Sequence, residues 1–246
     1  MIKKRIKKVY SCILMLAMVL SLMGCGGTKG DYQGYVKNLI TANYIGVSEG
    51  YVKSTGANEE DVDALYLQNV ARLASNLSDY YSLDIWNDTE LSRAMTTLAR
   101  RIYSNVKFDV GKPYKDNNID YVDVTIYPID IINQTNEEVV AYIQGFNEAV
   151  DRGDYDDYTK EQYEYEYASG IMGILANAVN EISYAEPQVV QVRIIVSEDT
   201  FYIGNDDFRN IDKAIILSET YDIATETDAT ESIETNEQSE SDAESE

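Results

Sequence analysis

The spacing of hydrophobic residues changes repeatedly between residues 31 and 217, and these changes limit the folds available to the chain. Up to Ile102, apolar side chains recur three or four residues apart, which is typical of amphipathic helices. From Val106 they alternate with polar residues, as in strands that bury one face. Helical spacing returns after residue 135, and alternation returns at residue 188. The predicted order is three helices, two strands, two helices, two strands and a closing helix.

Polar residues that favour helix N-termini mark several of the expected helix starts. Asn58 and Asn87 each precede a helical stripe. Thr135 and Thr159 are each followed three residues later by Glu or Gln, which is the spacing of a capping box. We therefore expect helices to begin at these four positions. Trp86, just before Asn87, is interpreted as a hydrophobic staple for that helix, and a recognition residue is the alternative.

The expected strands form two neighbouring pairs rather than alternating singly with helices. Asp116-Asn117-Asn118 is a turn signal between the strands at 106–110 and 122–126, and the second pair covers 188–196 and 200–203. This order favours an α+β fold over a parallel sheet. We expect about six helices packed on a small four-stranded antiparallel sheet formed from two hairpins. Without an internal linker or repeat, residues 31–217 are interpreted as a single globular domain.

Composition excludes several functions. The 246 residues include no histidine and two cysteines, so histidine-based nucleophilic catalysis and a Cys/His zinc site are excluded. The formal charge of −23 argues against nucleic acid as a partner. The phosphate-binding motif Gly-x-x-x-x-Gly-Lys-Ser/Thr is absent from the sequence. We expect no cofactor and no metal centre. Whether the protein is an enzyme is left undecided, and a non-enzymatic role is favoured.

The first 24 residues have the pattern of a secretory signal peptide. Five basic residues and no acid come first, and an apolar run extends from Val9 to Met23. At about 15 residues the run is short for a membrane helix, which needs roughly 20. Small residues follow it. The segment 1–24 is therefore predicted to be a removable leader.

Leu22-Met23-Gly24-Cys25 at the end of this leader resembles a bacterial lipobox. The resemblance implies recognition of Leu22, Met23 and Gly24 by a signal peptidase, cleavage before Cys25, and attachment of a diacylglyceryl group to its sulfur. It thereby implies a palmitate-type lipid anchor at the outer face of the cytoplasmic membrane. Residues 25–30 would then form a flexible tether. The alternative is an ordinary secretory signal with an incidental cysteine.

A second resemblance covers Tyr35 to Asp130 and connects the chain with uncharacterised lipoproteins of Gram-positive bacteria. Its residues are Ala42-Asn43-Tyr44, Tyr51-Val52, Thr55-Gly56, Glu59-Glu60, Leu65-Tyr66, Ile102-Tyr103 and Tyr127-Pro128-Ile129-Asp130. None of these motifs carries established chemistry. The resemblance supports the anchor and a Gram-positive source, and it implies no mechanism.

The C-terminal segment 218–246 contains 11 acidic residues and no Lys or Arg. Tyr221, Ile223 and Ile233 are its large apolar residues. So little apolar surface does not offset the entropy of ordering, and we expect a disordered acidic tail. It either solvates the protein or binds a cation or a partner.

Two segments inside the domain are weak site candidates. Asp151, Asp154, Asp156 and Asp157 form a dense acidic loop that offers oxygen ligands to a hard cation such as Ca²⁺, although a solvated loop is the more common arrangement. The tyrosines are the second candidate. On a helix, Tyr163 and Tyr167 would be neighbours and pack, whereas on a strand they would form an aromatic binding face with Tyr165.

Taken together, these patterns predict a lipid-anchored extracytoplasmic domain with a non-catalytic binding or accessory role in the cell envelope. Its expected partners are the membrane, through the anchor, and an envelope protein, a peptide or a wall component. The alternative is a carboxylate-dependent hydrolase of cell-wall glycan, because glycoside hydrolysis needs no histidine and the chain has 43 acidic residues.

Overall fold

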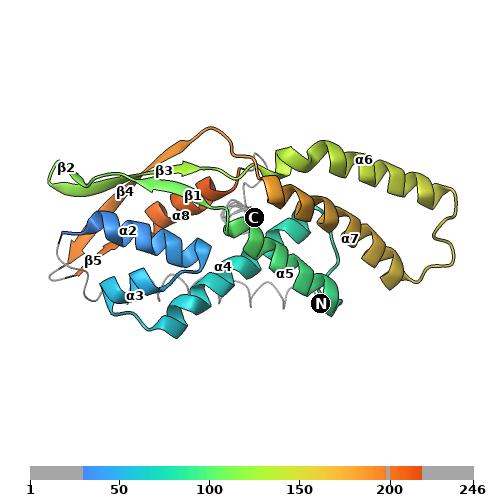
Figure 1. Cartoon of the computed structure of the whole chain (residues 1–246), viewed down its shortest axis with the longest axis horizontal. Coiled ribbons are helices and arrows are strands. Elements are labelled where there is room, and N and C mark those ends of the chain that lie inside the picture. Colours follow the sequence, from blue (N-terminus) through green and yellow to red (C-terminus); the bar gives the residue numbers. More distant parts are fainter. Residues whose placement is uncertain (1–29, 198–199, 218–246) are drawn as a thin grey trace, which may run out of the picture.

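The structure is a computed structural model that describes residues 30–197 and 200–217. It has an α+β fold, as the sequence predicts, with helices packed on one antiparallel sheet (Figure 1). Its α-helices are α2 (Tyr32–Ile40), α3 (Glu49–Thr55), α4 (Glu59–Tyr80), α5 (Thr89–Tyr103), α6 (Ile131–Asp151), α7 (Lys160–Ala178) and α8 (Asn205–Ile215). A π-helical turn, Thr41–Ile45, follows α2, and a 3-10 turn, Val179–Glu181, follows α7. The strands are β1 (Lys107–Val110), β2 (Tyr114–Asp116), β3 (Ile119–Tyr127), β4 (Gln188–Ser197) and β5 (Thr200–Ile203).

Capping side chains mark the first turns of several helices. Two of the four expected caps are confirmed. The Asn58 side chain accepts a hydrogen bond from the backbone N–H of Asp61 at the start of α4. Thr159 and Gln162 form a complete capping box at the start of α7. Each cap satisfies N–H groups that the first helical turn leaves without partners.

The other two expected caps are wrong. The cap of α5 is Asp88 rather than Asn87, because its carboxylate accepts hydrogen bonds from two N–H groups of the first turn. α6 begins after Asp130, and Thr135 lies one turn inside it, where its hydroxyl donates to the Ile131 carbonyl at 2.8 Å. The earlier start buries Ile131 completely, and this burial outweighs the local signal at Thr135.

The sheet contains the two predicted hairpins, with a fifth strand added. The strand order is β1-β3-β4-β5, and β2 also pairs with β3. Val110 pairs with Val124 and Tyr114 with Tyr121, so the β1–β2 side has one more residue than β3 between these pairs. This β-bulge divides the first strand of the hairpin into β1 and β2.

The predicted turn between β2 and β3 is also present. Asn117 and Asn118 both have positive φ angles, 48° and 66°, as the two central residues of a type I′ hairpin turn require. β3 then pairs with β4 along most of its length, with Val122 opposite Val192. Both valines are fully buried, so this face of the sheet is part of the core against α2 and α8.

The α6–α7 helical hairpin lies between β3 and β4 in the sequence and projects away from the sheet (Figure 1). α6 packs on α7, and α7 packs on α5. Ile129 anchors the base of this hairpin: its N–H donates to the Ile215 carbonyl, and its own carbonyl accepts from the N–H of Leu217. None of the helices in the described ranges combines the length and hydrophobicity needed to span a bilayer.

Candidate functional site

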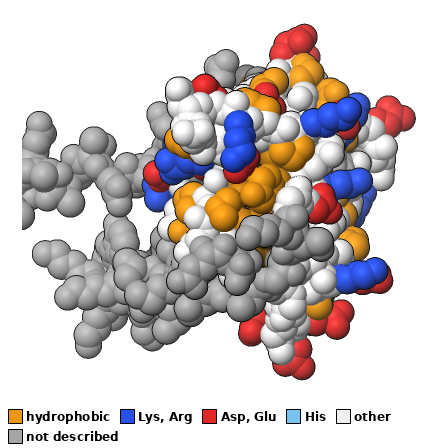
Figure 2. Space-filling model, turned by 90° about the vertical axis from the view of Figure 1, so that its left-hand side faces the viewer, with side chains coloured by type: hydrophobic (Ala, Val, Ile, Leu, Met, Phe, Trp, Pro, Cys, Tyr) orange, Lys and Arg blue, Asp and Glu red, His pale blue; other side chains and the backbone are white. Residues whose placement is uncertain are grey.

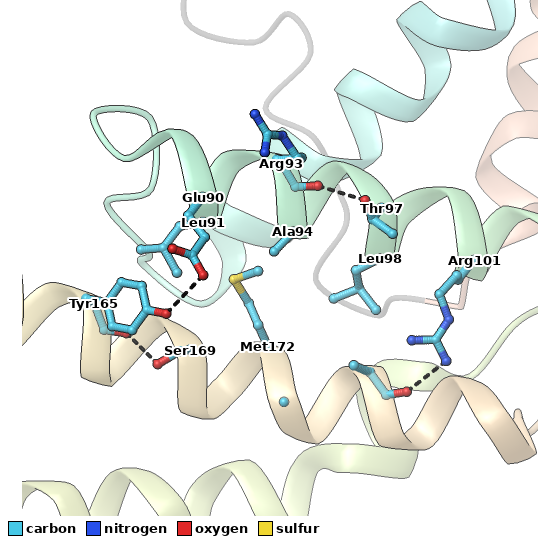
Figure 3. Close-up of a pocket in the computed structure, with 12 residues that line it drawn as sticks. Glu90, Leu91, Arg93, Ala94, Thr97, Leu98, Arg101, Tyr165, Ser169 and Met172 are labelled. Atoms are coloured by element: carbon cyan, nitrogen blue, oxygen red, sulfur yellow. Dashed lines mark hydrogen bonds between the residues drawn. The ribbon is translucent and has the colours of Figure 1, made fainter.

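A groove of about 450 Å³ lies between α5 and α7, where the helical hairpin meets the rest of the domain (Figure 3). Its floor is mostly apolar, and Met172 of α7 points towards α5. The side chains that line it are Glu90, Leu91, Arg93, Ala94, Thr97, Leu98 and Arg101 from α5, and Tyr165, Ser169, Met172, Gly173 and Ala176 from α7.

Small residues keep the groove open. α7 presents Ser169, Gly173 and Ala176 to it, and α5 presents Ala94. A Cβ atom added at Gly173 would have no heavy atom within 4 Å, so the space above this glycine is empty. The larger apolar residues Leu91 and Leu98 are buried beneath and hold α5 in place. The groove is therefore a concave apolar surface, which is the usual form of a binding site.

Polar contacts bridge the two helices at each end of the groove. At one end, the Tyr165 hydroxyl donates to Glu90 Oε1 at 3.4 Å, and the negative charge of Glu90 raises the pKa of Tyr165 above its usual value. At the other end, Arg101 Nη2 donates to the Ala176 carbonyl at 3.1 Å and to Asn180 Oδ1 at 2.9 Å. These contacts connect the two helices at both ends of the groove.

The two hydroxyl groups that line the groove donate to backbone carbonyls of their own helices. The Ser169 hydroxyl donates to the Tyr165 carbonyl at 2.6 Å, and the Thr97 hydroxyl donates to the Arg93 carbonyl at 2.9 Å. Neither is paired with a side-chain base, which nucleophilic hydroxyls need. The lining contains one carboxylate, that of Glu90.

The acidic loop lies at the tip of the α6–α7 hairpin, away from the groove. Asp151 ends α6, and Asp154, Asp156 and Asp157 follow it on the surface. Arg152 forms an ion pair with Asp154 at 2.7 Å. In the described part of the chain, no three Asp, Glu or Cys side chains are placed to hold one metal ion. Cation binding by this loop stays a prediction.

The tyrosines near the start of α7 pack as expected for a helix. The rings of Tyr163 and Tyr167 lie 5.1 and 5.2 Å from that of Phe146, which is 4% exposed, and Tyr155 stacks on it at 4.8 Å. Tyr165 points to the groove instead. The aromatic cluster of Phe146, Tyr155, Tyr163 and Tyr167 therefore joins the two helices near their tip.

Other apolar residues are exposed outside the groove. Trp86 is 52% exposed, so it does not serve as the expected buried staple of α5. Figure 2 shows a strip of hydrophobic side chains, with Lys and Arg beside it, at the end of the molecule where β2, β5, α2 and α3 lie. Ile119 and Val196, beside the two hairpin turns, are 38% and 48% exposed. The groove differs from these surfaces because two helices and their polar bridges enclose it.

A polar cluster of the buried Tyr44 with the partly buried Arg72 and Asp212 was not foreseen from the sequence. Asp212 Oδ1 accepts from the Tyr44 hydroxyl at 2.9 Å and from Arg72 Nη2, which joins the π-helical turn to α4 and α8. Burial, and next the charge of Asp212, raise the pKa of Tyr44 well above its usual value. The three residues are far apart in the sequence, so periodicity gives no indication that they meet.

Most of the residues that resemble Gram-positive lipoproteins are structural. Ala42-Asn43-Tyr44 lies in the π-helical turn and is buried, and Tyr51, Thr55 and Ile102-Tyr103 are also in the core. Ile129 is the anchoring residue of the helical hairpin. None of these motifs lines the groove. Leu22, Met23, Gly24 and Cys25 lie outside the described residues, as does the acidic segment 218–246.

Comparison with known proteins identifies a similar fold. No family model and no curated protein sequence matches the chain. A solved structure from the Gram-positive bacterium Bacillus subtilis, described as a "putative lipoprotein (ycdA)", superimposes with a TM-score of 0.51 at 14% identity. The match covers 77% of this chain and 57% of that one, so the present chain spans little more than half the length of its neighbour. At this identity the likeness concerns the fold.

Proposed function

We propose that this chain is a bacterial lipoprotein, held by Cys25 at the outer face of the cytoplasmic membrane, whose domain binds a protein, peptide or wall component in the α5–α7 groove. The observation that carries the anchor is Leu22-Met23-Gly24-Cys25, placed directly after a basic and apolar leader. The fold shared with a Bacillus subtilis protein described in the same terms is consistent with it.

Electrostatics supports a lipid as the means of attachment. Removal of the five basic leader residues changes the formal charge from −23 to −28. A domain with this charge is repelled by an anionic membrane surface. Two acyl chains on one cysteine provide stable attachment, whereas a single chain binds reversibly. The lipid would thus hold the domain at the membrane against this repulsion.

The groove supports a binding role for the domain. It is apolar, concave and held open by the Glu90–Tyr165 and Arg101–Asn180 contacts. Glycan hydrolysis requires two carboxyl groups on either side of the scissile bond. The groove lining supplies Glu90 alone, so no observation there favours the hydrolase alternative.

The two cysteines provide a matched test of the anchor. The chain is produced in a Gram-positive host with a labelled fatty acid, and the label and membrane association are followed. Cys25→Ala should abolish labelling and release the domain from the membrane fraction. Cys12→Ala, which changes a residue of the leader, should leave both unchanged. Equal labelling of the Cys25→Ala variant would refute the anchor.

A further inference from the structure

Positive charges that lack acidic partners border the α5–α7 groove. Arg93 and Arg101 line it, and Arg100 lies beside them on α5. Within the described ranges, no carboxylate oxygen lies within 4.0 Å of the guanidinium group of any of these three arginines. Arg101 instead donates to neutral oxygens. In a chain with 43 acids and 20 bases, this is a locally basic site.

An occupant of the groove must therefore combine two properties. Carboxylates would meet the guanidinium groups of Arg93 and Arg101, with which they form charge-assisted hydrogen bonds. Apolar side chains would cover the floor around Met172 and the empty space above Gly173. A purely acidic or a purely apolar segment satisfies only one of these two requirements.

Four successive contacts link Leu217, the last described residue, to the Arg101 end of this groove. The N–H of Leu217 donates to the Ile129 carbonyl at 2.8 Å, and Ile129 forms a β-bridge with Tyr184. The Tyr184 hydroxyl donates to the Asn105 carbonyl at 2.7 Å, and the Asn105 amide donates to the Arg101 carbonyl at 2.8 Å. This series of contacts connects Leu217, after which the segment 218–246 begins, to the end of the groove at Arg101.

Residues 218–246 have the composition that the groove requires. They carry 11 acids and no base, and Tyr221 and Ile223 follow closely after Leu217, among Glu219 and Asp222. Ten extended residues reach up to about 35 Å. The groove, from Glu90 to Arg101 on α5, is about 17 Å long at the rise of an α-helix. The segment is therefore long enough to follow it.

We propose that the acidic segment 218–246 docks in the α5–α7 groove of its own chain, with Tyr221 and Ile223 towards the apolar floor and neighbouring carboxylates towards Arg101 and Arg93. It then competes with any external ligand for the same surface. This inference rests on the groove being the binding surface of the proposed function, and it does not depend on the lipid anchor. An external ligand would accordingly share the same chemistry, with acidic residues beside apolar ones.

Two equivalent glycines provide the test. Gly173 in the groove and Gly145 on α6 both lie inside helices, and an added Cβ atom meets no heavy atom within 4 Å at either position. In the full chain, each is replaced in turn by the photoreactive amino acid p-benzoylphenylalanine, and cross-linked peptides are identified by mass spectrometry after irradiation. We expect Gly173, and not Gly145, to capture peptides from 218–246 of the same chain.

Charge reversal and salt sharpen this result. Arg93→Glu should reduce the Gly173 cross-link at least fivefold, and so should 1 M salt, which screens exposed charges. Lys112→Glu, which changes an exposed cation in the β1–β2 connection, should leave the cross-link unchanged. Failure of Gly173 to capture the segment, or equal capture from both glycines, would overturn the inference. Capture of another molecule alone would overturn it while supporting the proposed binding role of the groove.

Discussion

The body of the domain and its projecting arm are built differently. We define the body as α2–α4, the sheet and α8, and the arm as the helical hairpin α6–α7. The body contains a partly buried ion pair, Arg72–Asp212, together with the fully buried Tyr44, and β3 pairs with β4 along most of its length. The arm consists of two helices joined by the aromatic cluster around Phe146, and it packs on the rest of the domain through α5.

This difference separates the residues that determine the fold from those that form the groove. The residues that resemble Gram-positive lipoproteins lie mainly in the body and are buried. The groove lies where the arm meets α5, and small side chains such as Gly173 and Ala94 form it. The buried residues of the body serve the fold and carry no information about a ligand.

The largest expected effect is in the body. Tyr44→Ala removes a fully buried ring and its hydrogen bond to Asp212, and we expect the free energy of unfolding to fall by about 4 kcal/mol. Tyr44→Phe keeps the ring and should cost about 1 kcal/mol. Urea denaturation measures both. A loss below about 1 kcal/mol for Tyr44→Ala would contradict the central role given to this cluster.

A smaller and more local effect is expected in the arm. Phe146→Ala should destabilise by about 3 kcal/mol, because the ring is buried against tyrosines of α7. Hydrogen exchange should become faster along α6 and α7, with β3 unchanged. Val140→Ala, at an exposed position of the same helix, should change stability by less than about 0.5 kcal/mol. An equal increase of the hydrogen-exchange rate in β3 and in the two arm helices would show that the arm and the body unfold as one unit.

The capping box of α7 tests the arm at its tip. Thr159→Ala removes the hydroxyl that accepts from the N–H of Gln162, and we expect a loss of about 1 kcal/mol. Thr159→Ser keeps the hydroxyl and should retain most of the stability. Thermal denaturation followed by circular dichroism compares the two variants. Identical melting temperatures for the two variants would show that the capping hydroxyl does not contribute to stability.

The smallest effect is a dependence on alkaline pH. Burial raises the pKa of Tyr142, at the arm, to about 12 from an ordinary value of 10. Between these values the unfolded chain loses the phenolic proton while the folded protein keeps it, so stability is complete below pH 10 and falls as pH rises towards 12. Because Tyr142 is partly exposed, we expect it to contribute about 1 kcal/mol or less.

Tyr142→Phe removes this titration and checks the sign of the effect. Urea midpoints at pH 9 and pH 11 should differ less in the variant than in the unmodified protein. The hydroxyl also donates to the Glu166 carbonyl at 2.8 Å, so a constant loss at both pH values is expected in addition. A larger difference in the variant would contradict the raised pKa.

Elements with a strong local signal were predictable from the sequence. The alternation in β3 and β4, the Asn117-Asn118 turn and the caps at Asn58 and Thr159 each depend on neighbouring residues, and each is present. Thr135 was misinterpreted because its spacing to Glu138 matches a capping box, while burial of Ile131 decides where the helix begins. Local patterns thus fail where tertiary packing competes with them.

The groove was not predictable, for a different reason. Its residues come from α5 and α7, about 75 positions apart, as the Glu90–Tyr165 contact illustrates. α5 alone has the hydrophobic spacing of an amphipathic helix, whereas the apolar residues of α7 are only weakly segregated to one face. Gly173 and Ala176 are inconspicuous in the sequence. Their shared role arises when the arm packs on α5, and the sequence contains no local signal for that contact.

The most direct test of the proposed lipid anchor at Cys25 is the intact mass of the protein extracted from the membranes of a Gram-positive host. We predict a chain that begins at Cys25 and carries the mass of a diacylglyceryl group on its sulfur. A chain with an unmodified Cys25, or one that still carries residues 1–24, would contradict the central claim.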